Sequence, residues 1–247
     1  MIIISIDGPA AAGKGFIAKA LAKKFGYLYF NTGNIYRYLA YQAIVAQVNL
    51  NSVEDLLKLI DRIFYRDLKS TITYLEHDHD EIHTSKVSKA ASIIAAKNQI
   101  RTALVEVQRS VPQLYQQEIK SQPLLENPKQ CDSGATRTPT EFGIIVDGRD
   151  IGTSIFPDAT CKYFITASAK IRAKRRLNQL QLRNEQGIYG NILADIIERD
   201  LRDSSRPLSP MSVAHDAFII DSSNFNKEEI VNFMIKLTET VLSKAKN

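Results

Sequence analysis

The chain has 247 residues, of which 44% are hydrophobic and 24% are charged, and its formal net charge is +5. This length accommodates one sizeable α/β domain, and the composition excludes a chain that is disordered as a whole. No apolar stretch approaches the ~20 residues that a membrane span requires, and the apolar start is too short for a signal sequence. We therefore expect a cytoplasmic protein with no membrane partner.

The basic residues concentrate in two stretches, 172–183 and 199–206, where they are interleaved with acidic and apolar residues at helical spacing. A pocket for several phosphates explains this clustering better than a duplex-binding face does, so we expect no nucleic-acid partner. Cys131 and Cys161 have neither metal-type nor redox-type spacing, and we interpret them as reduced thiols.

An apolar strand pattern at residues 1–6 runs directly into a glycine-framed loop that ends in Gly13-Lys14. Such a loop turns its backbone N–H groups into one concavity, and the lysine and the N-terminus of the next helix add positive potential there. An ordinary glycine-rich turn is the alternative, but it does not account for the helical pattern of Ile17, Leu21 and Phe25. We predict a nucleoside triphosphate site formed by Gly8, Pro9, Ala10, Ala11, Ala12, Gly13, Lys14, Gly15 and Phe16.

Strand and helix patterns follow in the first half of the chain. A short strand at 28–30 precedes a helix from Asn31 to about Val48, and Ser52 caps a further helix. Residues 71–75 alternate and are β-branched, which predicts a strand in a small hairpin that turns near residues 77–80. Helices are predicted over 86–96 and 98–120, with Pro112 as a kink or break in the second.

The second half of the chain repeats the alternation of strands and helices. Residues 122–141 contain three prolines and no helical period, so we interpret them as a mobile surface insertion. Strands are predicted at 143–146, 162–165 and 218–220, and helices begin near residues 169, 191 and 227. This order predicts an α/β fold, in which a doubly wound parallel sheet is covered by helices on both faces.

Polar residues follow two of the predicted strands. Thr32 and Arg37 lie about one turn apart after the second strand, where Arg37 could grip a second phosphate; the alternative is a helix cap and a solvated arginine. Asp147-Gly148-Arg149-Asp150 ends another strand and offers groups for a polar ligand or Mg²⁺, the alternative being a self-paired charged turn.

The densest positive charge belongs to two predicted helices and comprises Arg172, Arg175, Arg176, Arg199, Arg202 and Arg206. These arginines could close over a triphosphate as a lid and stabilise charge during phosphoryl transfer; the alternative is a pair of solvated helices with internal salt links. The histidines at 77, 79 and 83 fall in a polar turn without supporting ligands, so we expect no metal site formed by protein side chains there.

These segments together resemble the bacterial cytidylate kinase (CMP kinase) family, a branch of the P-loop nucleoside monophosphate kinases. The resemblance runs almost end to end, through the loop at 8–16, Thr32 to Arg37, Ala90-Ala91-Ser92, Asp147 to Thr153, and Glu198 to Arg206. It implies transfer of the γ-phosphoryl group of ATP to CMP or dCMP with Mg²⁺, and we expect the protein to be a cytoplasmic monomer. It also implies a single kinase domain over 1–247, with a monophosphate-binding lobe at about 36–96 and a helical lid at about 172–206.

The resemblance further implies roles for individual residues. Ser92, Arg101 and Asp150 read the cytosine, where an acid facing the exocyclic amine discriminates against uracil. Arg37 and Arg149 clamp the acceptor phosphate, and Asp203 and Arg206 contact its ribose and phosphate. The remaining implied members of the site are Thr32 and Arg199 for the acceptor, and Lys14, Arg175, Arg176 and Arg202 for catalysis.

Two departures from the family's pattern stand out. The family usually has glycine where Ala11 stands and threonine where Phe16 stands, so an expected hydroxyl contact to phosphate or Mg²⁺ is missing. The metal could then be held through water or by an acid such as Asp147. The insertion at 122–141 is longer than the usual connection. Two other functions stay open at this point: a kinase of another acceptor such as UMP or AMP, and a catalytically weakened nucleotide- or RNA-binding protein.

Overall fold

The computed structural model describes residues 1–75, 77, 79–121, 142–182 and 184–245, so the predicted insertion at 122–141 and Cys131 lie outside the described residues. The chain divides into two compact units, one formed by Met1–Tyr29 with Gln130–Asn247 and the other by Phe30–Lys129. Within the described residues, no helix has the length and apolar character needed to cross a bilayer.

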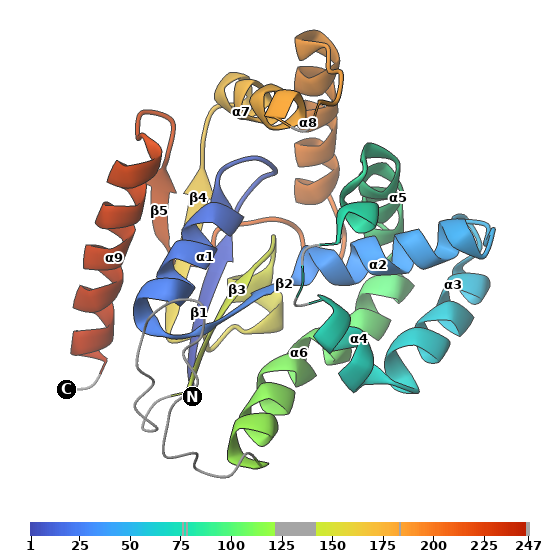
Figure 1. The fold of residues 1–247 in the computed structure, drawn as a ribbon, viewed down its shortest axis with the longest axis horizontal. Helices are drawn as coiled ribbons and strands as arrows, with labels where there is room; N and C mark the ends of the chain where they lie inside the picture. The colour runs from blue at the N-terminus through green and yellow to red at the C-terminus, as the bar shows by residue number, and fades with distance from the viewer. Residues whose placement is uncertain (76, 78, 122–141, 183, 246–247) are drawn as a thin grey trace. The chain divides into compact units, whose positions relative to one another are not determined.

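A parallel sheet lies at the centre of the first unit (Figure 1). Its strands are β1 (Ile2–Asp7), β2 (Leu28–Asn31), β3 (Gly143–Asp147), β4 (Cys161–Thr166) and β5 (Phe218–Asp221). Their order is β2-β3-β1-β4-β5, and the pairs β1–β3, β1–β4 and β4–β5 are all parallel. The first strand of the chain therefore lies in the middle of the sheet, and the predicted α/β fold with a parallel sheet is confirmed.

Helices α1 (Lys14–Phe25) and α9 (Lys227–Lys244) pack against this sheet and against each other. The core beneath them is built from β-branched strand residues and apolar helix positions, among them Ile4, Ile6, Leu21, Ile165 and Met234. Such nearly continuous apolar strands are typical of a parallel sheet whose strands are buried. The same pattern in the sequence is what made these strands predictable.

Helices α7 (Ala169–Leu182) and α8 (Tyr189–Ser204) pair with each other beyond the carboxyl ends of the strands (Figure 1). Their contact is a small apolar cluster of Ala173, Leu180, Ile192 and Ile196. Ala11 of the glycine-framed loop at 8–16, which we call the phosphate loop, packs against it. The loop and the helix pair are therefore in direct contact.

The second unit is helical, apart from the end of β2. It contains α2 (Thr32–Val45), α3 (Val53–Ile60), the π-helical turn η1 (Asp61–Tyr65), α4 (Leu68–Leu75), the 3₁₀ turn η2 (Asp80–His83), α5 (Ser85–Ala95) and α6 (Asn98–Ser121). Helix α2 packs on α5, and α3 on α6. Ser52 caps α3 by accepting a hydrogen bond from the Asp55 N–H, as predicted.

The predicted strand and hairpin at residues 71–80 are wrong, because residues 68–75 form helix α4 and residues 80–83 form η2. Thr71, Ile72 and Leu75 are all buried at helical spacing, and the Thr71 hydroxyl donates to the Ile63 carbonyl. Tertiary packing has here outweighed the β propensity of the branched residues. Helix α6 continues past Pro112 to Ser121, so no break occurs at the proline.

Candidate active site

The phosphate loop joins the end of β1 to the start of α1. Gly8 has a φ of 137°, and a Cβ there would lie 2.0 Å from the Ile165 carbonyl oxygen of β4, so only glycine fits. Gly13, with a φ of 98°, is the N-cap of α1, and the first turn of the helix contains no acidic residue. No side chain caps the N–H groups of that turn, and together with the helix dipole they give positive potential at the place where the sequence predicts an anion site.

Lys14 is buried at the base of this loop, where its ammonium donates a hydrogen bond to the Pro9 carbonyl at 2.9 Å. Burial, reinforced by the positive charge of Arg149, lowers the pKa of Lys14 to about 7. The opposite charge of Asp147 counters that shift. An anionic ligand in the loop would favour the ammonium form of Lys14.

Two buried carboxylates flank Lys14. Oδ2 of Asp147, at the end of β3, accepts a hydrogen bond from the Tyr29 hydroxyl at 3.0 Å, and a Cβ added to Gly15 would lie 3.2 Å from it. Asp7 accepts the N–H groups of Ile151 and Gly152 at 2.8 Å each, while burial raises the pKa of Asp7 to about 7. Asp147 therefore lies beside the first turn of α1, whereas Asp7 fixes the backbone that follows Asp150.

Phe16 occupies the position where a threonine hydroxyl is expected from the resemblance. Its side chain is 47% exposed, and the Lys227 ammonium lies 5.7 Å from the centre of its ring. The ring therefore lies at the surface of the loop and contributes no polar atom to the site.

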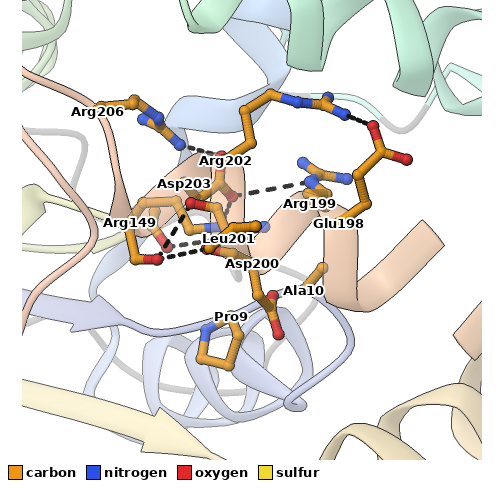
Figure 2. A network of polar contacts seen from close by, with 12 residues as sticks. Pro9, Ala10, Arg149, Glu198, Arg199, Asp200, Leu201, Arg202, Asp203 and Arg206 are labelled. Atoms are coloured by element: carbon orange, nitrogen blue, oxygen red, sulfur yellow. Dashed lines mark hydrogen bonds and ion pairs between the residues drawn. The ribbon is translucent and has the colours of Figure 1, made fainter. Parts of the chain in front are cut away.

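The carboxylate of Asp203, on α8, forms ion pairs with three guanidinium groups (Figure 2). It pairs with Arg149 at 3.1 Å, with Arg199 at 3.8 Å and with Arg206. Burial opposes ionisation of Asp203, but Arg149 and Arg206 outweigh it and hold the pKa of Asp203 below its usual value. Arg149, Arg199 and Arg206 are thus brought together by a single carboxylate.

The other predicted arginines of the lid differ in their surroundings. Arg175 donates to the carbonyls of Ala12 and Ser222, whereas Arg202 pairs with Glu198 one turn back on α8. Arg176 is half-buried on α7.

The second unit holds four of the predicted acceptor residues. Thr32 is the buried first residue of α2, where the Asn31 side chain caps the helix by accepting the Gly33 N–H at 2.8 Å. Arg37 donates to the Ser88 hydroxyl at 2.6 Å and to the Ile82 carbonyl at 3.2 Å. Ser92 and Arg101 are also buried, at 7% and 3% exposure.

Several residues of the first-unit site had no role predicted from the sequence. Asp7, Tyr29, Asp200 and Ser222 all contact the loop, the strand ends or the lid through their side chains. The position of Asp7 at the end of β1, immediately before the first glycine, is a signal that could have identified it. Nothing in the sequence marks Tyr29 or Ser222, because their contacts are with distant segments.

A family model and the similar proteins all point to the same family. The family model for cytidylate kinase matches residues 4–119 and 134–240. The cytidylate kinase of Clostridium tetani is 36% identical over 99% of this chain and 97% of its own length. Those of Caldicellulosiruptor saccharolyticus and Shewanella putrefaciens are 34% and 36% identical, each over 98% of this chain and 97% of their own length.

Proposed function

Because the chain belongs to the cytidylate kinase family, we infer that it transfers the γ-phosphoryl group of ATP to CMP or dCMP, giving CDP or dCDP and ADP. The observation that carries this function is the family match over nearly the whole chain. The phosphate loop with its buried Lys14 is the local structure that such a reaction requires. Neither alternative, another acceptor or a non-catalytic binding protein, gains support from these relatives.

ATP is the phosphoryl donor, and we propose that residues 8–16 bind its phosphates through their N–H groups and the Lys14 ammonium. A protein usually holds nucleotide-bound Mg²⁺ through one or two carboxylates, while the phosphates and several waters complete its coordination, and Asp147 lies beside the first turn of α1. Asp147 therefore fits a role in holding Mg²⁺, and Phe16 has no hydroxyl to do so. When bound, Mg²⁺ neutralises charge on the phosphates.

The transfer itself needs positioning and charge stabilisation more than covalent chemistry from the protein. We propose that Lys14, Arg149 and Arg206 stabilise the charge of the transferring phosphoryl group. Arg176 and Arg202 are further candidates for this role, whereas the hydrogen bonds of Arg175 favour a different one. Closure of the lid, proposed at about 172–206, would exclude water as a competing acceptor.

For the acceptor nucleotide, the proposed phosphate and ribose contacts are Thr32, Arg37, Arg149, Arg199, Asp203 and Arg206. Ser92, Arg101 and Asp150 are proposed to read the cytosine, because an acid accepts from its exocyclic amine and an arginine donates to its ring acceptors. A uracil would leave the buried acid without that donor, which is a strong basis for discrimination.

We also propose a cytoplasmic monomer that has no nucleic-acid partner, with the monophosphate-binding lobe at about 36–96. Sedimentation of the purified protein with and without ATP would test the monomer.

The function is tested by ADP release with ATP against CMP, dCMP, UMP and AMP. We expect turnover with CMP or dCMP to exceed turnover with UMP and AMP by at least about 100-fold, the scale expected when a buried polar group loses its partner. Equal turnover of all four acceptors, or none, would contradict the proposal.

The base-reading residues have a separate test. Asp150→Asn and Arg101→Met should each weaken CMP binding by about 10- to 100-fold and leave ATP binding nearly unchanged, because each removes a contact to the base alone. Calorimetric titration with each nucleotide measures both affinities. Equal losses for CMP and ATP would show that these residues do not read the base.

A further inference from the structure

The carbonyl oxygens of the phosphate loop are held by two arginines of α7. A loop that directs its N–H groups to an anion directs some of its carbonyls the other way, and those carbonyls need donors of their own. Arg172 and Arg175, three residues apart and hence on one face of α7, supply such donors to Ala10 and Ala12.

Three hydrogen bonds to neutral acceptors position the Arg175 side chain. One terminal nitrogen donates to the Ala12 carbonyl at 3.3 Å and to the Ser222 hydroxyl at 2.9 Å, and the other donates to the Ser222 carbonyl at 2.7 Å. Ser222 is itself buried, and its hydroxyl lies 3.0 Å from both the Ala12 and the Thr166 carbonyl oxygens, so its single proton is shared between the loop and the end of β4. Arg175 and Ser222 therefore hold the same carbonyl of the loop from two elements.

Arg172 does the same two residues earlier in the loop. Its guanidinium donates to the Ala10 carbonyl at 3.2 Å and to the Ala167 carbonyl at 2.8 Å, and it pairs with Asp200 of α8 at 2.6 Å. The ion pair with Asp200 fixes the side chain, so that its remaining donors face the loop and the end of β4.

Between these two carbonyls lies the one loop position with a strained backbone. Ala11 has a φ of 59°, which favours glycine and costs an alanine about 1 kcal/mol. Its methyl group packs against the apolar cluster of α7 and α8. Such a conformation persists only where neighbouring contacts enforce it, and here the held carbonyls on either side do so.

We propose that Arg172 and Arg175 are positioning residues, which hold the phosphate loop in its nucleotide-binding conformation through the Ala10 and Ala12 carbonyls, with Ser222 as the second support of Ala12. The proposal rests on the proposed function, since it assigns the loop to ATP. It makes binding of ATP and ADP depend equally on Arg175, because the loop contacts phosphates that both nucleotides share.

A residue that stabilises the transferring group directly would behave differently. Its removal lowers kcat, leaves the affinity for ADP unchanged, and is partly rescued by lysine, which keeps the charge. A positioning arginine makes three hydrogen bonds in a fixed fork, which lysine cannot reproduce.

The test compares Arg175→Met, Arg175→Lys, Ser222→Ala and the double variant Arg175→Met/Ser222→Ala. We expect Arg175→Met and Arg175→Lys to weaken ATP and ADP binding alike by about tenfold, with kcat at saturating ATP within about threefold of the parent. Ser222→Ala should weaken both by a smaller factor, and the double variant should lose less than the product of the single losses. Binding is measured by calorimetry, and faster amide exchange across residues 8–14 should accompany its loss.

Lys236→Met is the control, since it removes a positive charge from an exposed position on α9, outside the loop and the lid, and should change neither affinity nor kcat. Three results would overturn the proposal: a lower kcat of Arg175→Met with unchanged ADP affinity, recovery of the parent's properties in Arg175→Lys, or unchanged ATP and ADP affinity in Ser222→Ala. If Arg175→Met fails to fold, Ser222→Ala alone decides it. Wild-type turnover of CMP tests the proposed function independently, so the two failures are distinguishable.

Discussion

Lys14 carries a charge that depends on pH near neutrality in the free protein. Burial and the nearby Arg149 lower its pKa to about 7, whereas a bound triphosphate would favour the ammonium form. Binding of ATP should therefore take up a proton, and the affinity should fall as pH rises, by at most tenfold per pH unit. This follows because the lysine in the free protein is increasingly neutral above its pKa.

Calorimetry between about pH 7.5 and about pH 9, where phosphate is fully ionised, measures this effect. Repeating the titration in buffers of different ionisation enthalpy gives the number of protons taken up. Lys14→Arg is the control, because its guanidinium stays protonated and should take up none. An affinity for ATP that is flat over this range would contradict the lowered pKa.

Phe16 is the other residue of the loop with a specific consequence. Phe16→Thr should raise kcat or lower the Mg²⁺ concentration needed for half-maximal rate, each by about threefold to tenfold, because it restores a hydroxyl beside the phosphates. Phe16→Val matches threonine in shape and lacks only the hydroxyl, so it should show neither gain. Steady-state rates are measured across a Mg²⁺ series. If they do not differ between the threonine and valine variants, the hydroxyl has no such effect and the prediction is wrong.

At the scale of elements, the buried carboxylate of Asp203 holds α8 to Arg149, in the loop that follows β3. Asp203→Asn leaves three guanidinium groups without their shared counter-charge and should lower the free energy of unfolding by about 3 kcal/mol. Glu239→Gln is the control, because its pair with Lys24 is about half exposed and should contribute under about 1 kcal/mol. Urea unfolding at neutral pH measures both; equal losses would contradict the role of Asp203.

Comparison of the predicted and observed strands and helices shows which of them the sequence predicts correctly. The strands β1 to β5 and the helices α1 to α3 and α5 to α9 were predicted, because a strand or an amphipathic helix has a pattern set by its own residues. Thr71 to Leu75 has the composition of a strand but forms part of α4, since its burial is decided by α2, α6 and η1. Short segments with few apolar residues depend most on such neighbours.

At the scale of the whole molecule, a sequence pI of about 9.1 is compatible with nucleic-acid binding, but the fold turns several arginines of the two basic stretches, and Arg149, toward loop carbonyls and buried carboxylates. Five arginines contact loop carbonyls or buried carboxylates of the first unit, namely Arg149, Arg172, Arg175, Arg199 and Arg206. Charge held this way is not available as a surface stripe for phosphates of a duplex.

We therefore expect RNA binding to be no tighter than the non-specific range of about 10⁻⁴ to 10⁻⁶ M at physiological salt. Fluorescence anisotropy with a labelled single strand and a labelled duplex measures it, with ATP added as a competitor. Submicromolar binding that weakens steeply with salt and persists in the presence of ATP would contradict this expectation.

The sequence by itself determined the fold class, the phosphate loop and the family, because these depend on order and spacing along the chain. It also placed Lys14, Arg149 and Asp203 in polar motifs. Only the tertiary structure decided that Asp203 gathers three arginines and that Arg175 and Ser222 hold Ala12. Those contacts join residues up to 210 positions apart, and their geometry follows from how strands and helices pack, which no local pattern encodes.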